Sequence, residues 1–220
     1  MGVFYNPSII TEGLVFSLDV ANSKCYSGSG TTVNGMVKTI PGVLNNGVGY
    51  SSTNSGSFTF DGTNDFVSFN IDPVFNFGTG DFTVLAWHKT SNKSNYSTVL
   101  QLDDGNGTGI LFYTTISSGV FRNWVAGQPR NGTIDICTGQ WVQLGLTRSS
   151  GLCTQFVNSV SDVTFAAAGS VATSTRPLVL GQNANSYFYN GNISQVQFYN
   201  RALSAQEILQ NYNATKGRYL

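Results

Sequence analysis

The sequence predicts an all-β protein, and three observations lead to that prediction. Charged residues make up only 10% of the 220 residues, against about 25% in an average globular protein. Glycine is abundant, with 25 residues, and Asn, Ser and Thr are frequent, which favours turns and strands over helices. Short apolar segments recur along the chain between clusters of Gly, Asn, Ser and Asp. Together these features predict one antiparallel two-sheet sandwich of about a dozen short strands.

The first half of the chain supplies the strongest strand patterns. Leu14, Phe16 and Leu18 alternate with polar residues in the first predicted strand. Two aromatic-rich strands, 56–60 and 65–70, flank an Asp-Gly-Thr-Asn turn. The segment between them and the first strand, 20–55, lacks a clear pattern and is expected to be a long connection with little regular structure.

The segment 82–87 is apolar on both of its faces. Phe82, Val84 and Ala86 share one face, and Leu85 and Trp87 share the other. An antiparallel strand of this kind lies in the middle of a sheet whose second face is also covered, by loops or by a partner. His88, the only histidine, follows it and is interpreted as a structural residue rather than a catalyst.

Seven further strands are predicted in the second half. They cover 98–102, 110–115, 120–126, 141–148, 152–158, 178–181 and 193–199, with 149–151 as a three-residue hairpin loop. The side chains expected to be buried between the sheets are Trp87, Leu144, Leu146 and Phe198.

One helix is predicted, close to the C-terminus. Ser204 and Glu207 have the spacing of a capping box, in which each side chain satisfies a backbone amide of the other residue. Ile208, Leu209 and Tyr212 then form an apolar stripe that can dock on the sandwich.

The charge balance excludes two classes of partner. The chain has 11 basic and 11 acidic residues, whereas nucleic-acid-binding and membrane-surface proteins need a concentrated basic face. No apolar run reaches the roughly 20 residues that cross a bilayer, and the N-terminus lacks the pattern of a secretory signal. Cys25, Cys137 and Cys153 have no zinc-site spacing and are expected to be free thiols, with a Cys137–Cys153 bridge as the alternative.

A series of motifs resembles the laminin-G-like branch of the concanavalin A-like jelly rolls. In family order these are FDGTNDFV (60–67), DFTVLAW (81–87), GQWVQLGLT (139–147), FVN (156–158), LGQ (180–182) and GNISQVQFYNRALS (191–204). The opening segments TEGLVFSLD (11–19) and YSGSGTT (26–32), and the closing YNATKGRY (212–219), are similar to those of bacteriophage virion versions of this domain.

The resemblance implies a jelly-roll virion structural protein, acting in capsid decoration or in a tail or fibre. Its expected partners are other virion proteins, further copies of itself and host-surface glycans, and it would be assembled in the host cytoplasm and located in the virion. The alternative is a stand-alone, lectin-like carbohydrate-binding module. The chain is predicted to have no enzymatic activity, because a glycoside hydrolase needs two carboxyl groups across the scissile bond. Its only glutamates are Glu12 and Glu207, and the adjacent pair Asp103 and Asp104 resembles a turn.

Three candidate sites follow. Asp61, Asn64 and Asp65 offer hard oxygen ligands for calcium, but capping of their own turn is the favoured interpretation, so no cofactor is expected. In calcium-binding relatives an acidic pair often stands where this chain has Ser194 and Gln195. The candidate glycan-binding residues, which combine aromatic rings with amide and carboxylate groups, are Tyr96, Asp103, Asn183, Asn185, Tyr187 and Tyr189.

The N-terminal arm, 1–12, is the third candidate, ahead of a jelly-roll domain at 13–220. Its apolar residues are Val3, Phe4, Tyr5, Ile9 and Ile10. Since Asn6-Pro7 favours an extended path, the arm is predicted to dock on a neighbouring protein. The alternative is that the arm folds back over its own sandwich.

Overall fold

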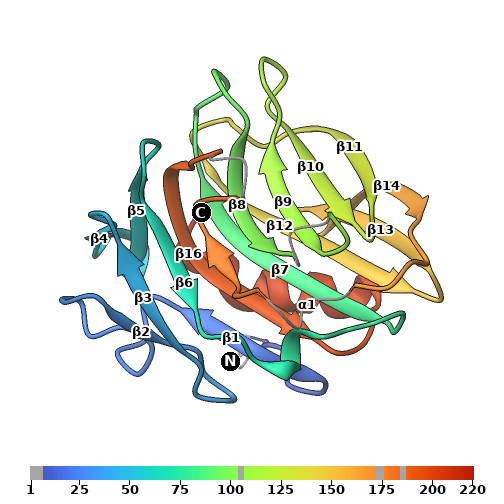
Figure 1. Cartoon of the computed structure of the whole chain (residues 1–220), viewed down its shortest axis with the longest axis horizontal. Helices are drawn as coiled ribbons and strands as arrows, with labels where there is room; N and C mark the ends of the chain where they lie inside the picture. The colour runs from blue at the N-terminus through green and yellow to red at the C-terminus, as the bar shows by residue number, and fades with distance from the viewer. Residues whose placement is uncertain (1–6, 104–106, 172–175, 184–186) are drawn as a thin grey trace, which may run out of the picture.

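Two stacked antiparallel sheets make up the protein (Figure 1). The computed structural model describes residues 7–103, 107–171, 176–183 and 187–220. Sheet A has the order β14-β13-β12-β7-β16-β5-β4, and β1 also pairs with β16. Sheet B has the order β11-β10-β9-β8-β15-β6-β3-β2. The predicted two-sheet antiparallel sandwich is confirmed.

The elements have the following bounds. Sheet A consists of β1 (Leu14–Asp19), β4 (Gly49–Ser51), β5 (Ser57–Asp61), β7 (Phe82–Lys89), β12 (Trp141–Ser149), β13 (Leu152–Val157), β14 (Val160–Ala166) and β16 (Asn190–Tyr199). Sheet B consists of β2 (Thr32–Asn34), β3 (Pro41–Asn45), β6 (Phe66–Phe69), β8 (Ser97–Leu102), β9 (Ile110–Thr114), β10 (Val120–Val125), β11 (Gln128–Asp135) and β15 (Val179–Leu180). The helical segments are α1 (Ala205–Thr215) and the 3-10 turns η1 (Thr53–Ser55), η2 (Pro73–Phe75) and η3 (Lys216–Arg218).

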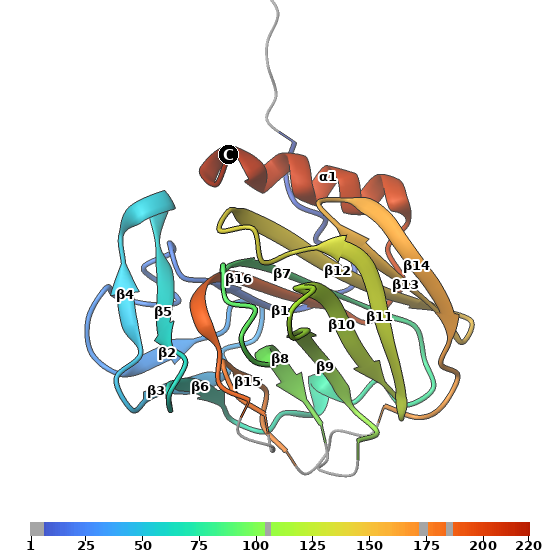
Figure 2. The ribbon, with the colours of Figure 1, turned by 90° about the horizontal axis from the view of Figure 1, so that it is seen from above.

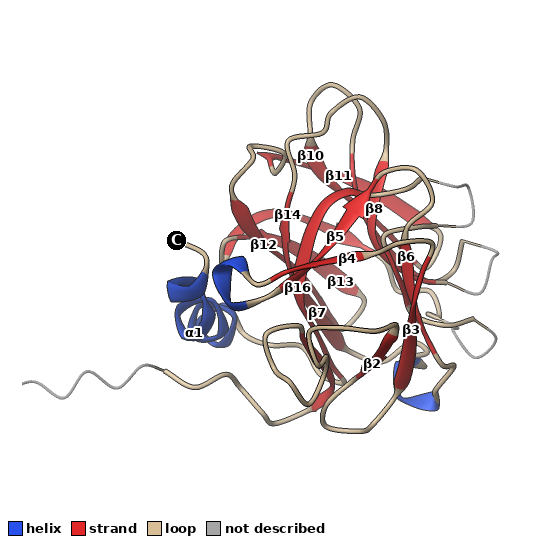
Figure 3. Cartoon of the chain, turned by 90° about the vertical axis from the view of Figure 1, so that its left-hand side faces the viewer, coloured by secondary structure: helices blue, strands red, loops and turns tan. Residues whose placement is uncertain are grey.

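Strand β7 lies in the centre of sheet A, between β12 and β16, and both of its faces are buried. Val84 and Ala86 belong to the core between the sheets, whereas Leu85 and Trp87 face the other way. Helix α1 covers that outer face of sheet A, and sheet B lies on the far side (Figures 2 and 3). The covering layer that the sequence required is therefore the chain's own C-terminal helix.

Trp87, Leu144, Leu146 and Phe198 are all buried, as predicted. Trp87, however, is not between the sheets. It stacks on Tyr219, with ring centroids 4.3 Å apart, and its indole Nε1 donates to Thr215 Oγ1 at 3.0 Å. The expectation was wrong for this residue because alternation along β7 turns Trp87 away from Val84 and Ala86, under the helix.

The predicted capping box is present at the start of α1. Glu207 N donates to Ser204 Oγ, and Ser204 N donates to Glu207 Oε2 at 2.8 Å. Arg201 forms an ion pair with Glu207, and its hydrogen bond lowers the pKa of that carboxyl to about 2. The buried face is formed by Ile208, Asn211 and Thr215, whereas Leu209 is 46% exposed, so the predicted apolar stripe was wrong at Leu209.

The segment 20–55 was expected to have little regular structure, and this was wrong. It contains β2, β3 and β4, which add edge strands to both sheets. These strands are only three to five residues long. Too few apolar side chains fall on one face to give a visible alternation in the sequence.

The hairpin between β12 and β13 is one residue tighter than expected. Ser149 pairs with Leu152, so the loop contains only Ser150 and Gly151. Both loop residues have positive φ, 49° and 80°, as the tight turns that match the twist of paired strands require.

The cysteines are buried and free, as expected, and the alternative Cys137–Cys153 bridge is absent. Burial raises the pKa of Cys137 to about 11 and that of Cys153 to about 12. In the part of the chain that the structure describes, no helix combines the length and apolar character needed to cross a membrane.

Candidate functional site

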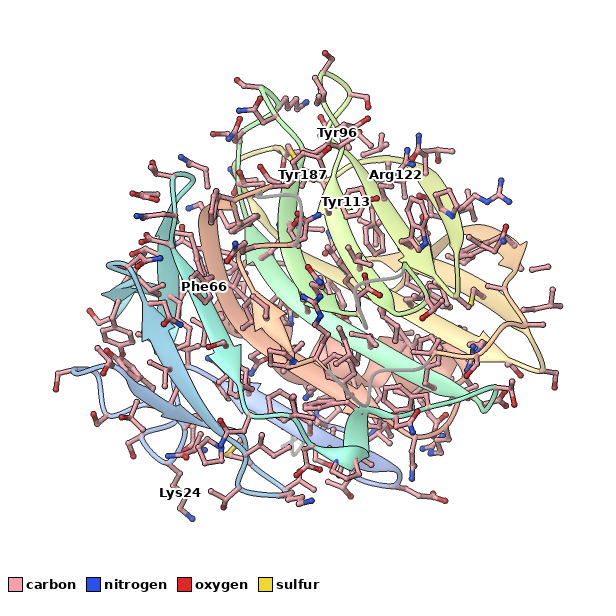
Figure 4. All side chains as sticks on the ribbon, viewed as in Figure 1. Lys24, Phe66, Tyr96, Tyr113, Arg122 and Tyr187 are labelled. Carbon is pink, nitrogen blue, oxygen red and sulfur yellow. The ribbon has the colours of Figure 1, made fainter. Side chains whose placement is uncertain are left out.

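An aromatic hollow lies on the outer face of sheet B, away from α1. Five side chains line it, and we call it the tyrosine hollow: Tyr96, Tyr113, Arg122, Trp124 and Tyr187. Its volume is about 200 Å³. Figure 4 shows four of these residues together over β8, β9 and β10.

Strand register brings the hollow together. Arg122 of β10 pairs with Tyr113 of β9, and Trp124 pairs with Leu111. In β10, Phe121 and Val125 point into the core, so alternation places Arg122 and Trp124 on the outer face.

Two loop residues complete the hollow from the side of β8. Tyr96 directly precedes that strand, and its ring lies 6.1 Å from that of Tyr113 and 5.4 Å from that of Tyr187. The backbone of Tyr187 is fixed in two places, since its N–H donates to Asn183 Oδ1 and its carbonyl accepts from Thr98 N. These two backbone hydrogen bonds therefore hold Tyr187 in place beside Tyr96.

Arg122 supplies the positive charge of the hollow. Its guanidinium carbon lies 5.8 Å from the centre of the Tyr113 ring, and its Nη1 donates to Asn131 Oδ1 at 3.1 Å. Burial raises the pKa of the Tyr113 phenol, while the guanidinium acts in the opposite direction. Tyr113 therefore keeps its proton at neutral pH and remains a hydrogen-bond donor.

Trp124 contributes its aromatic ring to the hollow. The side chain is half-buried, and its indole Nε1 is itself buried, with no hydrogen-bond partner within the described residues. The indole N–H is therefore not presented to a ligand, and the ring forms the contact surface.

Of the six predicted glycan-binding residues, Tyr96 and Tyr187 line the hollow, and Asn183 supports Tyr187. Asn185 lies outside the described residues. The other two are buried within the protein.

Tyr189 is a core residue, so its prediction as a glycan contact was wrong. It has no exposed surface, and its hydroxyl lies 2.9 Å from His88 Nδ1 and 3.2 Å from the Lys89 carbonyl. Asp103 is 6% exposed, and its Oδ1 accepts from Gly109 N at 3.2 Å. This carboxylate supports a turn and is not presented on the surface as predicted.

Sequence reasoning missed Tyr113, Arg122 and Trp124. The signal was available in the segment 120–125, where apolar residues in one phase leave Arg122 and Trp124 together on the opposite face. Binding groups were expected on loops at one edge of the sandwich, whereas these three residues stand on strands.

The calcium candidates form a hydrogen-bonded turn. Asp61 Oδ1 accepts from Thr63 N at 2.7 Å, and Asp65 Oδ2 accepts from Asp61 N at 3.0 Å. Asn64 is exposed, and its carbonyl accepts from the Asn46 amide. Among the described residues, no group of three His, Cys, Asp or Glu side chains could hold a metal ion.

We expect that chelation leaves the stability of the protein unchanged, because the carboxylates of Asp61 and Asp65 already accept backbone N–H groups of their own turn. The melting temperature should be the same in EDTA and in millimolar calcium. A drop in EDTA that calcium reverses would show that this turn holds an ion.

The described part of the predicted docking arm lies on its own domain. Ile10 N donates to Asn211 Oδ1 at 2.7 Å, its carbonyl accepts from the Tyr199 hydroxyl, and its side chain packs beside Tyr199 and Ile208. Ile9 is half-buried next to it. For Ile10 the favoured prediction was therefore wrong and the fold-back alternative holds, since Asn211 of α1 and Tyr199 of β16 bind its backbone. Val3, Phe4 and Tyr5 lie outside the described residues.

Comparison with known proteins gives a family and a set of folds. The model of the family described as the concanavalin A-like lectin/glucanases superfamily matches residues 49–209, well over half of the chain. A comparison with curated proteins gives no match.

Several solved structures share the fold. The binding domain of Paraclostridial mosquitocidal protein 1 is 17% identical with a TM-score of 0.72, over 92% of this chain and 52% of that one. Domain 4 of a GH43 extracellular arabinanase from Geobacillus stearothermophilus, in complex with arabinotriose, is 15% identical with a TM-score of 0.70, over 90% and 98%. Trypanosoma rangeli sialidase is 13% identical with a TM-score of 0.71, over 96% and 34%. The chain thus spans about half the length of the first of these and about a third of the sialidase.

Proposed function

Because the chain belongs to the concanavalin A-like lectin/glucanases superfamily, we propose that it is a carbohydrate-binding domain whose binding site is the tyrosine hollow. The observation that carries the proposal is the convergence of three tyrosines, a tryptophan and an arginine on one solvent-facing side of sheet B.

The chemistry of the hollow suits a sugar. A sugar ring offers apolar C–H faces and a rim of hydroxyl groups, and tyrosine and tryptophan pair an apolar ring with a polar tip. Small-molecule sites are mostly apolar, with a few polar groups that fix orientation. Here those polar groups are the tyrosine hydroxyls and the Arg122 guanidinium.

The comparisons with solved structures support a carbohydrate over other classes of ligand. The arabinanase domain that shares the fold is in complex with arabinotriose, and two of the similar folds named above belong to a toxin binding domain and a sialidase. We propose binding without turnover, because none of the five residues that line the hollow is a carboxylate.

A place in a phage virion is the finer part of the proposal. It rests on the resemblance of the segments 11–19, 26–32 and 212–219 to virion versions of this domain. A glycan-binding domain in a capsid decoration, tail or fibre would attach the particle to host-surface sugars. Detection of the protein on purified particles by immunogold labelling would test this placement.

Replacing Tyr187 with alanine should weaken glycan binding about tenfold or more, since aromatic residues at the centre of a site are typical hot spots. Tyr187 is 37% exposed, so its removal should cost little stability. The measurement is titration calorimetry with oligosaccharides that the unmodified protein binds in a screen of neutral and acidic glycans.

Phe66→Ala provides the matched control. Phe66 is a half-buried aromatic residue on β6 of the same sheet, outside the hollow (Figure 4). Its replacement should leave the affinity unchanged. Equal affinities of the Tyr187→Ala and Phe66→Ala variants, or failure of the protein to bind any glycan, would contradict the proposal.

A further inference from the structure

Two further hollows lie beside the tyrosine hollow on the same side of the protein. The first shares Arg122 with it, and we call it the arginine hollow: Arg122, Pro129, Arg130 and Asn131, with about 300 Å³. The second, which we call the amide hollow, is lined by Gln101, Arg176, Pro177, Val179, Gln182 and Asn183, with about 150 Å³. Asn183 links it to the tyrosine hollow through its hydrogen bond with Tyr187.

Each of the three hollows contains an arginine, and these arginines differ from the others in the chain. Arg201 pairs with Glu207, Arg218 pairs with Asp19, and Arg148 is fully buried. The remaining three of the six arginines are Arg122, Arg130 and Arg176. Within the described residues none of these three forms an ion pair.

Carboxylates are absent from the described residues that line the three hollows. Two acidic side chains that the structure describes nearby are engaged elsewhere. Asp162 accepts from Thr133 N and from its hydroxyl, and Asp103 accepts from Gly109 N.

Within the described residues, Arg122 and Arg176 are therefore guanidinium groups without an ion-pair partner on the outer side of sheet B. Arg130 differs, because it pairs with the core-facing Asn123 of β10 and its guanidinium lies over Phe165 of sheet A.

We propose that the three hollows together bind an acidic oligosaccharide, whose carboxylate or sulfate groups meet Arg122 and Arg176 while its sugar rings lie on the tyrosines. This inference rests on the proposed function and adds the chemical class of the ligand. It also predicts an extended ligand. The hollows span β15, β8, β9, β10 and β11, about 19 Å across neighbouring strands.

The arginines are suited to this task. A guanidinium group donates two parallel hydrogen bonds to a carboxylate or a sulfate, which a lysine ammonium does not. Arg122 is already placed against an aromatic ring, with its guanidinium carbon 5.8 Å from the centre of the Tyr113 ring. A side chain ordered in this way loses less conformational entropy when the ligand binds.

A single-stranded nucleic acid is the competing ligand, since it also combines stacking bases with negative charge. The glycan is favoured because nucleic-acid-binding domains concentrate far more basic residues, whereas this chain has 11 basic and 11 acidic residues. The amide side chains of Gln101, Gln182 and Asn183 add neutral groups suited to sugar hydroxyls.

The test compares four ligands of similar length with the whole chain. They are a neutral gluco-oligosaccharide, an oligogalacturonate, a sulfated heparin-type oligosaccharide and a single-stranded oligonucleotide. We expect one of the two acidic glycans to bind at least about tenfold more tightly than the neutral one at low salt. This preference for the acidic glycan should shrink as the salt concentration is raised. Whichever of the oligogalacturonate and the sulfated oligosaccharide binds more tightly identifies carboxylate or sulfate as the recognised group.

Arg176→Gln is the diagnostic variant, because Arg176 lines the amide hollow and lies outside the tyrosine hollow. It should weaken binding of the acidic glycan about fivefold to tenfold and leave that of the neutral glycan unchanged. Lys24→Gln, at an exposed lysine remote from the hollows (Figure 4), should change neither.

Two failures can be told apart. If neutral and acidic glycans bind equally at all salt concentrations, the acidic-ligand inference is overturned and the proposed glycan-binding function stands. Tighter binding of the oligonucleotide than of any glycan, or binding of no ligand, would overturn both.

Discussion

Replacing Arg148 with methionine should lower the free energy of unfolding by about 3 kcal/mol or more. Arg148 has no exposed surface, and its guanidinium donates to the carbonyls of Gly78, Gly80 and Gly169 at 2.5–2.9 Å. It also lies 4.8 Å from the centre of the Phe82 ring. Methionine fills similar space but removes the charged donor of three carbonyls, and hydrogen bonds to a charged group contribute about 1.5–3 kcal/mol each. The Gly78 carbonyl keeps a second donor, Val171 N.

Urea unfolding monitored by tryptophan fluorescence measures this effect. Lys24→Met is the control, because Lys24 is an exposed cation and its loss should change stability by less than about 0.5 kcal/mol. A loss below about 1 kcal/mol for Arg148→Met would show that water replaces the guanidinium at these carbonyls.

Acidification from pH 7.5 to 5.5 should lower the free energy of unfolding by about 1.4 kcal/mol through His88 alone. Burial lowers the pKa of His88 from 6.5 to about 3. Between these two values the unfolded chain binds a proton that the folded chain excludes, so stability falls as the pH falls below about 6.5. Above that value the histidine is neutral in both states and contributes no pH dependence.

The surroundings of His88 explain the shift. The Tyr189 hydroxyl can donate its single proton to the Lys89 carbonyl and accept from His88 Nδ1, while His88 Nε2 has no partner within the described residues. This arrangement assigns the proton of the neutral ring to Nδ1, and a second proton on Nε2 would place a charge in the core.

Because His88 is the only histidine, His88→Gln should abolish most of the pH dependence between 7.5 and 5.5. In the unmodified protein the ring signals of His88 in proton NMR should not titrate over this range. Titration of those signals near pH 6.5 would show that the ring is hydrated and the account of its burial is wrong.

Much of the fold could be predicted because strands leave a period of two in the sequence. The doubly apolar segment 82–87 identified the central strand β7 and the need for a covering layer. The capping box of Ser204 and Glu207 placed the start of α1, because it depends on local backbone geometry alone. The short edge strands β2 and β4 escaped prediction, since three residues cannot show an alternation.

The site was only partly predictable, for a different reason. Tyr96 and Tyr187 are far apart in the chain, and their 5.4 Å ring contact depends on how the strands are ordered in sheet B. Tyr187 and Tyr189 look alike in sequence, yet one is 37% exposed and the other has no exposed surface. In a regular strand, residues two apart would share a face. The irregular backbone at 187–189, ahead of β16, separates the two tyrosines, and the sequence alone does not reveal it.

The indole signals of the three tryptophans in a proton–nitrogen NMR spectrum report whether a glycan binds in the tyrosine hollow. Trp87 Nε1 is bonded to Thr215 and Trp141 Nε1 to Asn54, whereas Trp124 lines the tyrosine hollow. Trp124→Phe assigns the third signal. During titration with an oligosaccharide that the protein binds, the account predicts that the Trp124 signal shifts and the other two stay in place. A shift of the Trp141 signal with Trp124 unchanged would place the ligand on the opposite sheet, beside Lys89 and Asn192, and would contradict the assignment of the tyrosine hollow as the binding site.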